Sequence, residues 1–278
     1  MEKKFGNLFL YLILIIFGII MVYPLIWLFS ASFKPNNEIF GSLTLIPKEV
    51  IWDSYAKGWR GTGQFGFSLF FLNSFKLVVP TVAFTIISSA FVAYGFTRFK
   101  FPFKNLLFGL VISTLMLPQA VILIPRYILF KNLSWVDTYN PFIVPSIFAG
   151  SPFFIFMMVQ FLRGIPRELD ESAKIDGCNS FMILVRILMP LSKPALFSVG
   201  IFQFIWTWND FFNSIIFINS VKKFTVSLGL RMSLDVSSPT SWNQILAMSI
   251  VAIAPCILIF FFAQKYFVEG IATSGLKG

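Results

Sequence analysis

Residues 8–32 read LFLYLILIIFGIIMVYPLIWLFSAS, an apolar stretch without a single charged side chain. Roughly 20 such residues in a helix are enough to cross the hydrocarbon core of a bilayer. Lys3 and Lys4 precede the stretch as they would in a signal peptide. However, the apolar run is longer than the core of a signal peptide, and no small-x-small cleavage site follows a short core. We therefore expect a retained membrane-spanning helix here.

Five further stretches have the same apolar character. The composition agrees, because 57% of the 278 residues are hydrophobic and only 12% are charged, whereas about 25% are charged in an ordinary soluble domain. Backbone amides cannot be left unpaired in lipid, so the spans must be helical. The sequence predicts an all-α, polytopic membrane protein in which residues 1–278 form a single transmembrane domain. The six spans are expected at about residues 8–32, 71–96, 105–130, 139–162, 195–218 and 244–266.

The residue types exclude several kinds of site. The chain has no His, and its only two cysteines are Cys178 and Cys256. Catalysis by a His acid or base, His-containing metal sites and a framework of several disulfides are therefore excluded. We expect no catalytic residue, no bound metal and no cofactor. The formal net charge of +10 is typical of cytoplasmic loops beside anionic lipid, and nucleic acid is not expected as a partner.

Basic residues in the short loops predict the orientation, because Lys and Arg are retained on the cytoplasmic side. The loop of residues 97–104 holds three of them, whereas the equally long loop of residues 131–138 holds only Lys131. The first loop is therefore expected inside, together with the loop from Arg163 to Lys193. An even number of spans then places both termini in the cytoplasm. The loops expected outside, which also contain basic residues, lie at about 33–70, 131–138 and 219–243.

The inside loop of residues 164–194 is long enough to form structure of its own. It is expected to hold two short helices. Acidic residues crowd the first turn of the first helix, where the helix dipole favours anions, and Gly177 stands where a left-handed C-terminal cap belongs. Asn179 or Ser180 is expected to cap the second helix. An apolar stripe on that helix comprises Phe181, Leu184, Val185 and Leu188.

The first of these short helices has the chemistry of a docking element. Small residues at Ser172, Ala173 and Gly177 leave its backbone accessible, while Glu171 and Asp176 project negative charge. Such a surface suits a cleft in a soluble partner that contains Arg or Lys. The alternative is an amphipathic hairpin that lies on the lipid headgroups. The five basic residues from Arg163 to Lys193 would also favour that arrangement.

The spacing of this loop matches a known pattern. Glu171-Ser172-Ala173, three residues, Gly177, nine residues and then Ile187-Leu188-Met189-Pro190 resemble the EAA loop of ABC importer permeases, which reads E-A-A, three, G, nine, I-x-L-P. The chain departs from that pattern at Ser172, where one small residue replaces another. Other runs resemble the carbohydrate, maltose-type branch of the family: Ile165 to Leu169, Lys193 to Ala195, Asn73-Ser74, Ala93 to Phe99 and Trp208 to Phe211.

The resemblance implies a six-span permease in a bacterial-type cytoplasmic membrane. Such a permease pairs with a second, homologous permease, rests on two ATP-hydrolysing subunits and receives a sugar from an extracytoplasmic solute-binding protein. The sequence agrees on one point, because it lacks the G-x-x-x-x-G-K-[ST] phosphate loop. We therefore expect a transport subunit and not an enzyme. The residues implied to couple it to the ATPase are Glu171, Ser172, Ala173, Asp176, Gly177 and Phe181.

Ionisable side chains at membrane depth are functional candidates, because burying a charge in lipid is costly. Three occur in the expected spans: Lys76, Arg126 and Asp210. All three fall in the outer half of the bilayer. We expect Asp210 to pair with Arg126 or Lys76 around a polar vestibule. The alternative is that both cations reach the outer interface while Asp210 bonds to a neighbour on its own helix.

The fifth expected span carries a polar and aromatic stripe. Gln203, Trp206, Asp210, Asn213 and Phe217 recur at intervals of three and four residues, so a continuous helix would place them on one face. Rings that stack on sugars and amides that satisfy hydroxyls would suit a sugar path, whereas a helix packing seam would give the same stripe. The candidate path residues are Gln203, Trp206, Asn209, Asp210 and Asn213. A rival hypothesis, a secondary transporter driven by an ion gradient, would use Asp210 but would leave the loop pattern without a role.

Overall fold

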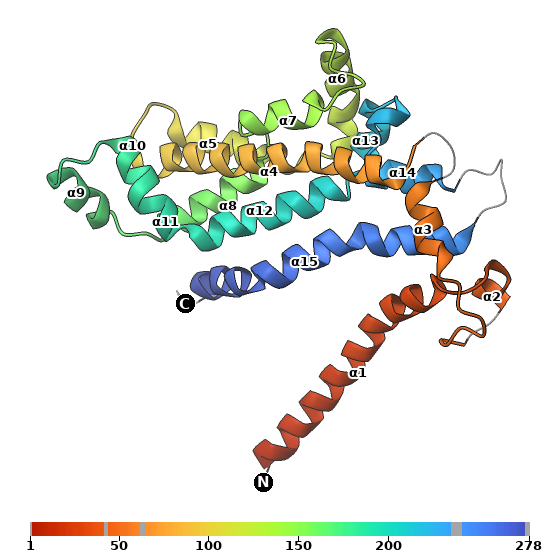
Figure 1. Cartoon of the computed structure of the whole chain (residues 1–278). Coiled ribbons are helices and arrows are strands. Elements are labelled where there is room, and N and C mark those ends of the chain that lie inside the picture. The colour runs from red at the N-terminus through yellow and green to blue at the C-terminus, as the bar shows by residue number, and fades with distance from the viewer. Residues whose placement is uncertain (1, 42–43, 62–64, 235–240, 276–278) are drawn as a thin grey trace. The chain divides into compact units, whose positions relative to one another are not determined.

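A computed structural model describes residues 2–41, 44–61, 65–234 and 241–275, and within these residues the regular secondary structure is helical throughout (Figure 1). The all-α fold class is therefore confirmed for the part of the chain that is described. In chain order the helices are α1 (Glu2–Ala31), α2 (Asn36–Gly41), α3 (Asp53–Arg60), α4 (Phe67–Arg98), α5 (Lys104–Thr114), α6 (Gln119–Asn132), α7 (Asn140–Ile147), α8 (Pro152–Arg163), α9 (Glu168–Ile175), α10 (Ser180–Met182), the π-helix η1 (Ile183–Leu188), α11 (Met189–Leu191), α12 (Lys193–Trp208), α13 (Phe211–Phe217), the 3₁₀ helix η2 (Val221–Lys223), α14 (Val226–Met232) and α15 (Trp242–Gly275).

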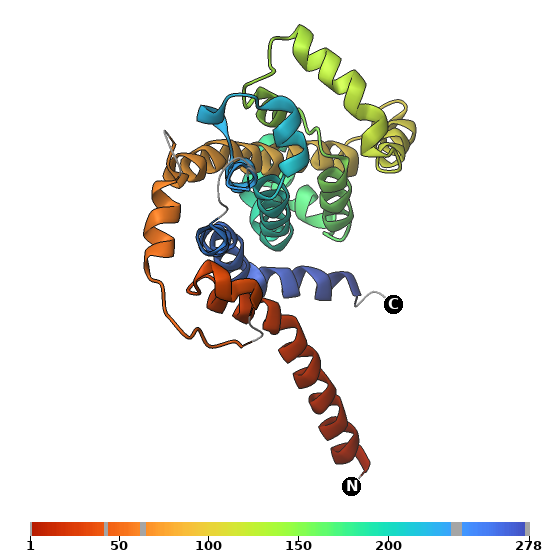
Figure 2. The same ribbon diagram turned by 90° about the vertical axis from the view of Figure 1, so that its right-hand side faces the viewer.

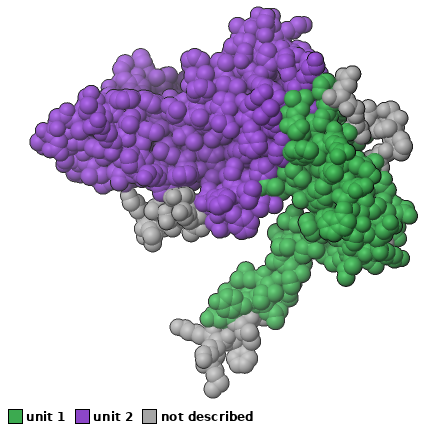
Figure 3. All heavy atoms as spheres, viewed as in Figure 1, with its two compact units in different colours: residues 1–69, 229–254 green, residues 70–228, 255–278 purple. Residues whose placement is uncertain are grey.

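The chain divides into two compact units, coloured separately in Figure 3. Unit 1 comprises residues 1–69 and 229–254, and unit 2 comprises residues 70–228 and 255–278. Each unit is described by itself below. Unit 2 holds the predicted docking loop and every candidate path residue, so it is the part that matters most for function.

The core of unit 2 lies where α4, α8, η1 and α12 meet. Figures 1 and 2 both show α4, α8 and α12 running side by side. Small side chains of α4 (Ala90, Ala93) allow close approach, and Phe154 and Met158 of α8 fill the space between the helices at 0–1% exposure. Since a buried apolar side chain contributes roughly 1.5–3 kcal/mol, this cluster fixes how the loop after α8 leaves the bundle.

Unit 1 holds α1, α2, α3 and the first part of α15. Gly58 of α3 lies so close to α15 that a Cβ atom there would meet Cγ of Met248 at 2.9 Å. A groove of about 410 Å³ beside this contact is lined mainly by Tyr55, Trp59, Met248 and Val251. The most apolar stretch of α1 is not buried against the rest of the chain, as expected for a helix that is surrounded by lipid or by another subunit.

Four helical stretches within the described residues are long and apolar enough to cross a membrane: Leu10–Ala31, Phe67–Arg98, Asn140–Arg163, which comprises α7 and α8, and Trp242–Gln264. They coincide with the first, second, fourth and sixth expected spans. Two further helix pairs reach the necessary length only if each bent pair counts as one span, namely Lys104–Thr114 with Gln119–Asn132 and Ser180–Leu191 with Lys193–Trp208. The structure thus supports four to six spans.

The third expected span, residues 105–130, is not one straight helix. α5 ends at Thr114, α6 begins at Gln119, and the two axes differ by 102°. Pro118 explains the break, because it has no N–H to donate and it disfavours helical geometry at the residue before it. Pro118 itself is extended, with φ −60° and ψ 132°.

The fifth expected span, residues 195–218, is also interrupted, and here no proline marks the place. α12 ends at Trp208, and a separate helix, α13, begins at Phe211. The Asp210 side chain accepts a hydrogen bond from the backbone N of Asn213 and so caps the new helix. A capping carboxylate stabilises the start of a helix, so Asp210 favours a new helix at this point. The prediction of one continuous helix was wrong.

Candidate coupling loop and translocation path

The predicted docking loop forms an ordered helix with a clear end. α9 carries Glu168, Asp170 and Glu171 in its first turn, as expected. Gly177 has φ +82°, a left-handed conformation that only glycine adopts without strain. The Asn179 side chain then accepts a hydrogen bond of 2.8 Å from the backbone N of Met182 and caps α10. The sequence predicted both caps of this loop correctly.

The side chains of α9 divide into an exposed face and a buried face. Glu171, Ser172 and Asp176 are exposed, and Ile175 stands out with an exposed fraction of 87%. Ala173, by contrast, is 5% exposed and belongs to the core cluster of unit 2. The exposed face therefore combines two carboxylates with a large apolar side chain. Ala173 was expected on the accessible side, and the structure corrects this because α9 packs through it.

The helix that follows is wound more loosely than expected. Residues Ile183–Leu188 form a π-helix, whose wider turn changes which side chains share a face. Ile183, Leu184 and Leu188 are buried, whereas Val185 and Phe181 are 39% and 60% exposed. Two members of the predicted stripe, Leu184 and Leu188, are thus buried, and the other two, Phe181 and Val185, are exposed. The Phe181 ring packs against Phe91 of α4, with ring centroids 6.2 Å apart.

A buried ion pair joins the loop to α4. Arg98, at the last position of α4, lies 2.6 Å from the Asp170 carboxylate through its Nε, and the two side chains are only 7% and 10% exposed. The same guanidinium donates from Nη1 to the carbonyl of Leu162 and from Nη2 to the carbonyl of Ile165, at 3.3 and 3.0 Å. Arg98 thus binds both sides of the turn between α8 and α9.

Two further contacts hold the loop at the same end of α4. The Tyr94 hydroxyl donates to the carbonyl of Ser180 at 3.0 Å, and Arg167 donates to the carbonyl of Thr97 at 2.8 Å. A small polar cavity of about 140 Å³ lies between these groups, and Asp170 and Arg98 both line it. Neither Arg98 nor Asp170 was among the predicted site residues. The acidic first turn and the basic end of the second span were visible in the sequence, but nothing in the sequence pairs them across 72 positions.

The candidate path residues on α12 have local partners. Gln203 donates to the Thr207 hydroxyl one turn later at 2.6 Å. Trp206 is 48% exposed and packs against Phe153 and Phe154 of α8, with ring centroids 5.2 and 5.1 Å apart. Asn209 donates to the carbonyl of Ile205 at 2.8 Å. Because α12 ends at Trp208, the predicted single stripe from Gln203 to Phe217 does not exist.

Asp210 and Asn213 form a polar cluster with α6. The Asn213 amide nitrogen donates to both carboxylate oxygens of Asp210, at 3.1 and 2.8 Å, and its oxygen accepts from Arg126 at 2.9 Å. Arg126 also lies over the rings of Phe130 and Phe217, 5.7 and 5.3 Å from their centroids. The expected neighbourhood of Asp210 and Arg126 is therefore present, but Asn213 bridges the two charges. Lys76 is exposed and takes no part in this cluster.

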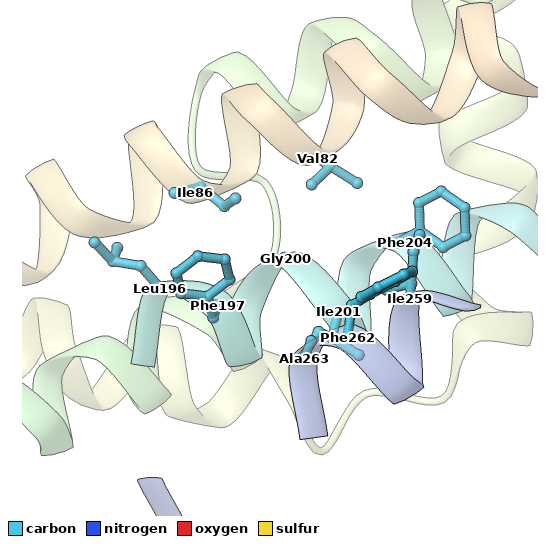
Figure 4. A pocket seen from close by; sticks show the side chains of 10 residues that line it. All are labelled: Val82, Ile86, Leu196, Phe197, Gly200, Ile201, Phe204, Ile259, Phe262 and Ala263. Carbon is cyan, nitrogen blue, oxygen red and sulfur yellow. The ribbon is translucent and has the colours of Figure 1, made fainter. Parts of the chain in front are cut away.

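An apolar groove of unit 2 offers no polar groups to a sugar. It has a volume of about 400 Å³ and lies between α4, α12 and α15. Its lining is apolar and includes Val82, Phe197, Phe204 and Phe262 (Figure 4). A sugar needs hydrogen-bond partners for its hydroxyls, so this surface suits lipid or another apolar helix. None of the candidate path residues lines it. Within the described residues, no group of three acidic or sulfur side chains could hold a metal ion.

At the opposite end of unit 2, the start of α4 holds a second loop. The Asn73 amide donates to the carbonyls of Lys222 and Phe224 at 2.9 and 3.0 Å, and the Ser74 hydroxyl accepts from the backbone N of Val226 at 2.9 Å. Asn73 and Ser74 had been singled out only as a motif that opens the second span. The structure gives them a physical role, because they satisfy backbone groups of the segment between α13 and α14.

Asp137, between α6 and α7, binds the same segment. Its carboxylate accepts from the backbone N of Asn219, from the backbone and hydroxyl of Ser220 and from Nζ of Lys223, at 2.6–3.0 Å. Burial acts to raise the pKa of Asp137, but these hydrogen bonds outweigh it and hold the pKa of that carboxyl well below its usual range. Asp137 therefore stays ionised under all ordinary conditions.

Together these features define a class of protein. Several long apolar helices and an ordered polar loop that presents an acidic face are the features of a multi-pass membrane protein. A family model confirms the class: the one described as "Binding-protein-dependent transport system inner membrane component" matches residues 85–273. The chain belongs to this family and is a permease subunit of an ABC importer.

Curated relatives cover almost the whole chain. It is 36% identical over 271 residues to the probable ABC transporter permease protein YurM of Bacillus subtilis, covering 98% of this chain and 87% of YurM. It is 34% identical to the arabinooligosaccharides transport system permease protein AraQ of the same species, covering 94% of this chain and 92% of AraQ. It is 31% identical to the sn-glycerol-3-phosphate transport system permease protein UgpE of Yersinia pestis, covering 98% and 99%.

A solved structure shares the fold. The match is to the crystal structure of a bacterial ABC transporter involved in the import of the acidic polysaccharide alginate, with a TM-score of 0.84 and 20% sequence identity over 96% of this chain and 98% of that one. A second crystal structure, of a bacterial alginate ABC transporter in complex with an alginate pentasaccharide-bound periplasmic protein, matches with a TM-score of 0.68 and 16% identity, covering 94% and 93%.

Proposed function

We propose that this permease forms half of the translocation path for a sugar or oligosaccharide that a solute-binding protein delivers from outside the cell. The second half would be a homologous permease, and two ATP-hydrolysing subunits would supply the energy. Support for a carbohydrate comes from the relatives, since AraQ is named for arabinooligosaccharides and the matched structure for alginate. UgpE is named for sn-glycerol-3-phosphate, so a small phosphorylated polyol is the competing substrate class.

The observation that carries the ATPase-coupling part of the proposal is the exposed face of α9. Glu171 and Asp176 offer negative charge, and the exposed Ile175 offers apolar surface next to Asp176 in the chain. Phe181 of α10 is also exposed. Charged rims around an apolar anchor are typical of protein interfaces. An interfacial hairpin, the alternative reading of the loop, would have to immerse the two exposed carboxylates at an anionic lipid surface, which is unfavourable. We propose six spans, with the loop of residues 164–194 and both termini in the cytoplasm.

The candidate sugar path uses residues around the break between α12 and α13. Trp206 offers an exposed ring, and Asn209 and Asn213 lie where the backbone leaves the helix. Irregular backbone at membrane depth is tolerated where it lines a cavity, which supports a path at this break. The apolar groove of Figure 4 is not part of it.

The coupling proposal is tested by reversing the charge of the exposed face. Glu171→Lys should leave membrane insertion intact but abolish ATP-driven uptake, because it repels a basic cleft. Lys100→Gln is the matched control, since Lys100 is an exposed residue of the neighbouring turn. Uptake of labelled sugar into proteoliposomes that contain the whole complex measures the effect. If Glu171→Lys still imports substrate at the normal rate, α9 does not dock with the ATPase.

The substrate is tested by the same complex. Purified with its solute-binding protein, the importer should hydrolyse ATP several-fold faster when an oligosaccharide is bound than when the binding protein is empty. Asp210→Asn should alter uptake while leaving the subunits associated. If sn-glycerol 3-phosphate and no sugar stimulates ATP hydrolysis, the proposed substrate class is wrong, but the protein is still an importer subunit.

A further inference from the structure

The two ends of α4 are each tied to a different loop of unit 2. At one end, Arg98 binds Asp170 in a nearly buried ion pair and donates to the carbonyls of Leu162 and Ile165. These groups come from α8, α9 and the turn between them. A buried guanidinium with three partners fixes position and angle at once, because its donors point in fixed directions. The coupling loop therefore cannot move without moving the end of α4.

At the other end, Asn73 and Ser74 hold the segment between α13 and α14. Asn73 is 4% and Ser74 1% exposed, and together they satisfy the carbonyls of Lys222 and Phe224 and the backbone N of Val226. Asp137 ties the start of the same segment through Asn219 and Ser220. Residues 219–226, named here the distal segment, are thus attached to the start of α4 by hydrogen bonds from two buried side chains to backbone groups of the segment.

Between these two attachments the helix is unbroken. At about 1.5 Å per residue, the stretch from Ser74 to Arg98 is about 36 Å long, which is comparable to the thickness of a bilayer. Pro80 lies inside it without interrupting it. Tight packing along its length, with Leu77, Val78, Ala90 and Ala93 at 0–1% exposure, leaves the helix little freedom to bend.

The other helical routes from the coupling loop are interrupted. The route through α8 and α7 passes through the non-helical residues 148–151, although Asn140–Arg163 is long and apolar enough to count as one span. The route through η1 and α12 contains a π-helix, a bend of 78° near Ser192 and a break at Asn209. The route through α5 turns by 102° before α6. A displacement at the loop can be absorbed at each of these joints. Of the described helices in unit 2, α4 is the one that runs from one loop to the other without a break.

We propose that α4 transmits the movement of the ATPase-coupling loop to the distal segment, with Arg98 and Asp170 as the input contact and Asn73 and Ser74 as the output contact. The inference rests on the proposed function, since it needs an ATPase that moves α9. Rigid elements held by discrete contacts at both ends carry coupling between distant sites efficiently. The four residues are positioning residues, and they touch neither ATP nor sugar.

The test follows the distal segment while the ATPase changes state. A fluorophore on Lys222→Cys, in a chain with Cys178→Ser and Cys256→Ser, reports on that segment, because the Lys222 side chain is exposed and only its carbonyl is bound by Asn73. Fluorescence is compared in the whole complex without nucleotide and after trapping with ATP and vanadate. We expect a clear spectral shift on trapping, and we expect Arg98→Gln and Asn73→Leu each to remove most of it.

Two measurements separate transmission from mere loss of structure. Basal ATP hydrolysis and subunit association should persist in Asn73→Leu, which breaks only the output contact, while stimulation by the loaded binding protein falls several-fold. Arg98→Lys keeps the positive charge but lacks the several fixed donors of the guanidinium, so it should retain part of the fluorescence shift. The control variants Lys100→Gln and Asn132→Leu change exposed residues near each end and should leave the shift unchanged.

Each outcome has one meaning. The role of α4 is overturned if the wild-type complex shows the fluorescence shift and Asn73→Leu and Arg98→Gln both show it in full. That result would leave the assignment as an importer subunit intact. If Arg98→Gln does not assemble, the result for Asn73→Leu alone decides. A wild-type complex that hydrolyses no ATP would instead overturn the proposed function on which this inference rests.

Discussion

The two loops at the opposite ends of unit 2 are held by ion pairs of very different kinds. Arg98 and Asp170 are 7% and 10% exposed, and the pair stands almost entirely out of water. Asp137 and Lys223 are 27% and 43% exposed, and the Asp137 carboxylate takes most of its hydrogen bonds from neutral groups. Removal of one partner of a buried ion pair is strongly destabilising, whereas an exposed ion pair contributes little to stability. The coupling end is therefore rigid, and the distal end rests on a network that tolerates the loss of one charge.

The largest effect is expected from removing half of the buried pair. Asp170→Leu leaves Arg98 charged and buried without its partner and should lower the free energy of unfolding by about 3–5 kcal/mol. Thermal unfolding in detergent measures the loss. The double variant Arg98→Met with Asp170→Leu should recover most of the stability, because no charge is left unpaired, yet it should not recover ATP-driven uptake. A double variant that transports normally would show that the pair serves stability alone.

A smaller effect is expected at the turn that ends α9. Gly177→Val places a β-branched side chain at φ +82°, and the strain should lower stability by about 1–2 kcal/mol. Since a Cβ atom there would meet nothing within 4 Å, the loss comes from the backbone and not from crowding. Gly177→Asn should be milder, because Asn adopts this conformation more readily. Equal stability of the Val and Asn variants would contradict the assigned cause.

The distal end should respond to pH through Asp137. Because its folded pKa lies below the unfolded value of about 3.9, its stabilising effect is fully present above pH 4 and is lost as the pH falls towards the folded pKa. Asp137→Asn should lower stability at pH 7 by about 1 kcal/mol. It should also flatten the decline of stability below pH 4. Unfolding curves at several pH values test this, and an unchanged pH profile in the variant would contradict it.

The smallest effect is expected for the partner of Asp137. Lys223→Gln removes a charge that is 43% exposed, while the bonds from Asn219 and Ser220 remain. We expect a change below about 1 kcal/mol that shrinks further in high salt. A loss as large as that for Asp170→Leu would remove the contrast between the two ends.

Local features of the coupling loop could be predicted from the sequence, because their causes are local. Gly177 and Asn179 signal their own conformations through residue type, and the acidic first turn of α9 is set by its neighbours. The long apolar runs likewise predicted α1, α4 and α15. By contrast, the pairing of Arg98 with Asp170 depends on how α4 and α8 pack, which no local signal encodes.

The breaks within the spans show a second limit. Most residues from Ala195 to Ile218 are apolar, so a search for long apolar runs does not reveal that Asp210 caps a new helix. Asp210 was recognised as an unusual charge at membrane depth, but its capping bond to Asn213 requires the structure. The π-helical period of Ile183–Leu188 was also invisible to a pattern that assumes 3.6 residues per turn.

We propose that α9 faces the cytoplasm, where an ATPase subunit binds it, and that the distal segment faces outward. Labelling with a membrane-impermeant maleimide tests it, using Ile175→Cys and Lys222→Cys in chains without the native cysteines, since both positions are exposed. In intact protoplasts we expect the Lys222→Cys variant to be labelled at once and the Ile175→Cys variant to be labelled only after lysis. Labelling of the Ile175→Cys variant in intact protoplasts would place the loop outside the cell and rule out its docking with a cytoplasmic ATPase.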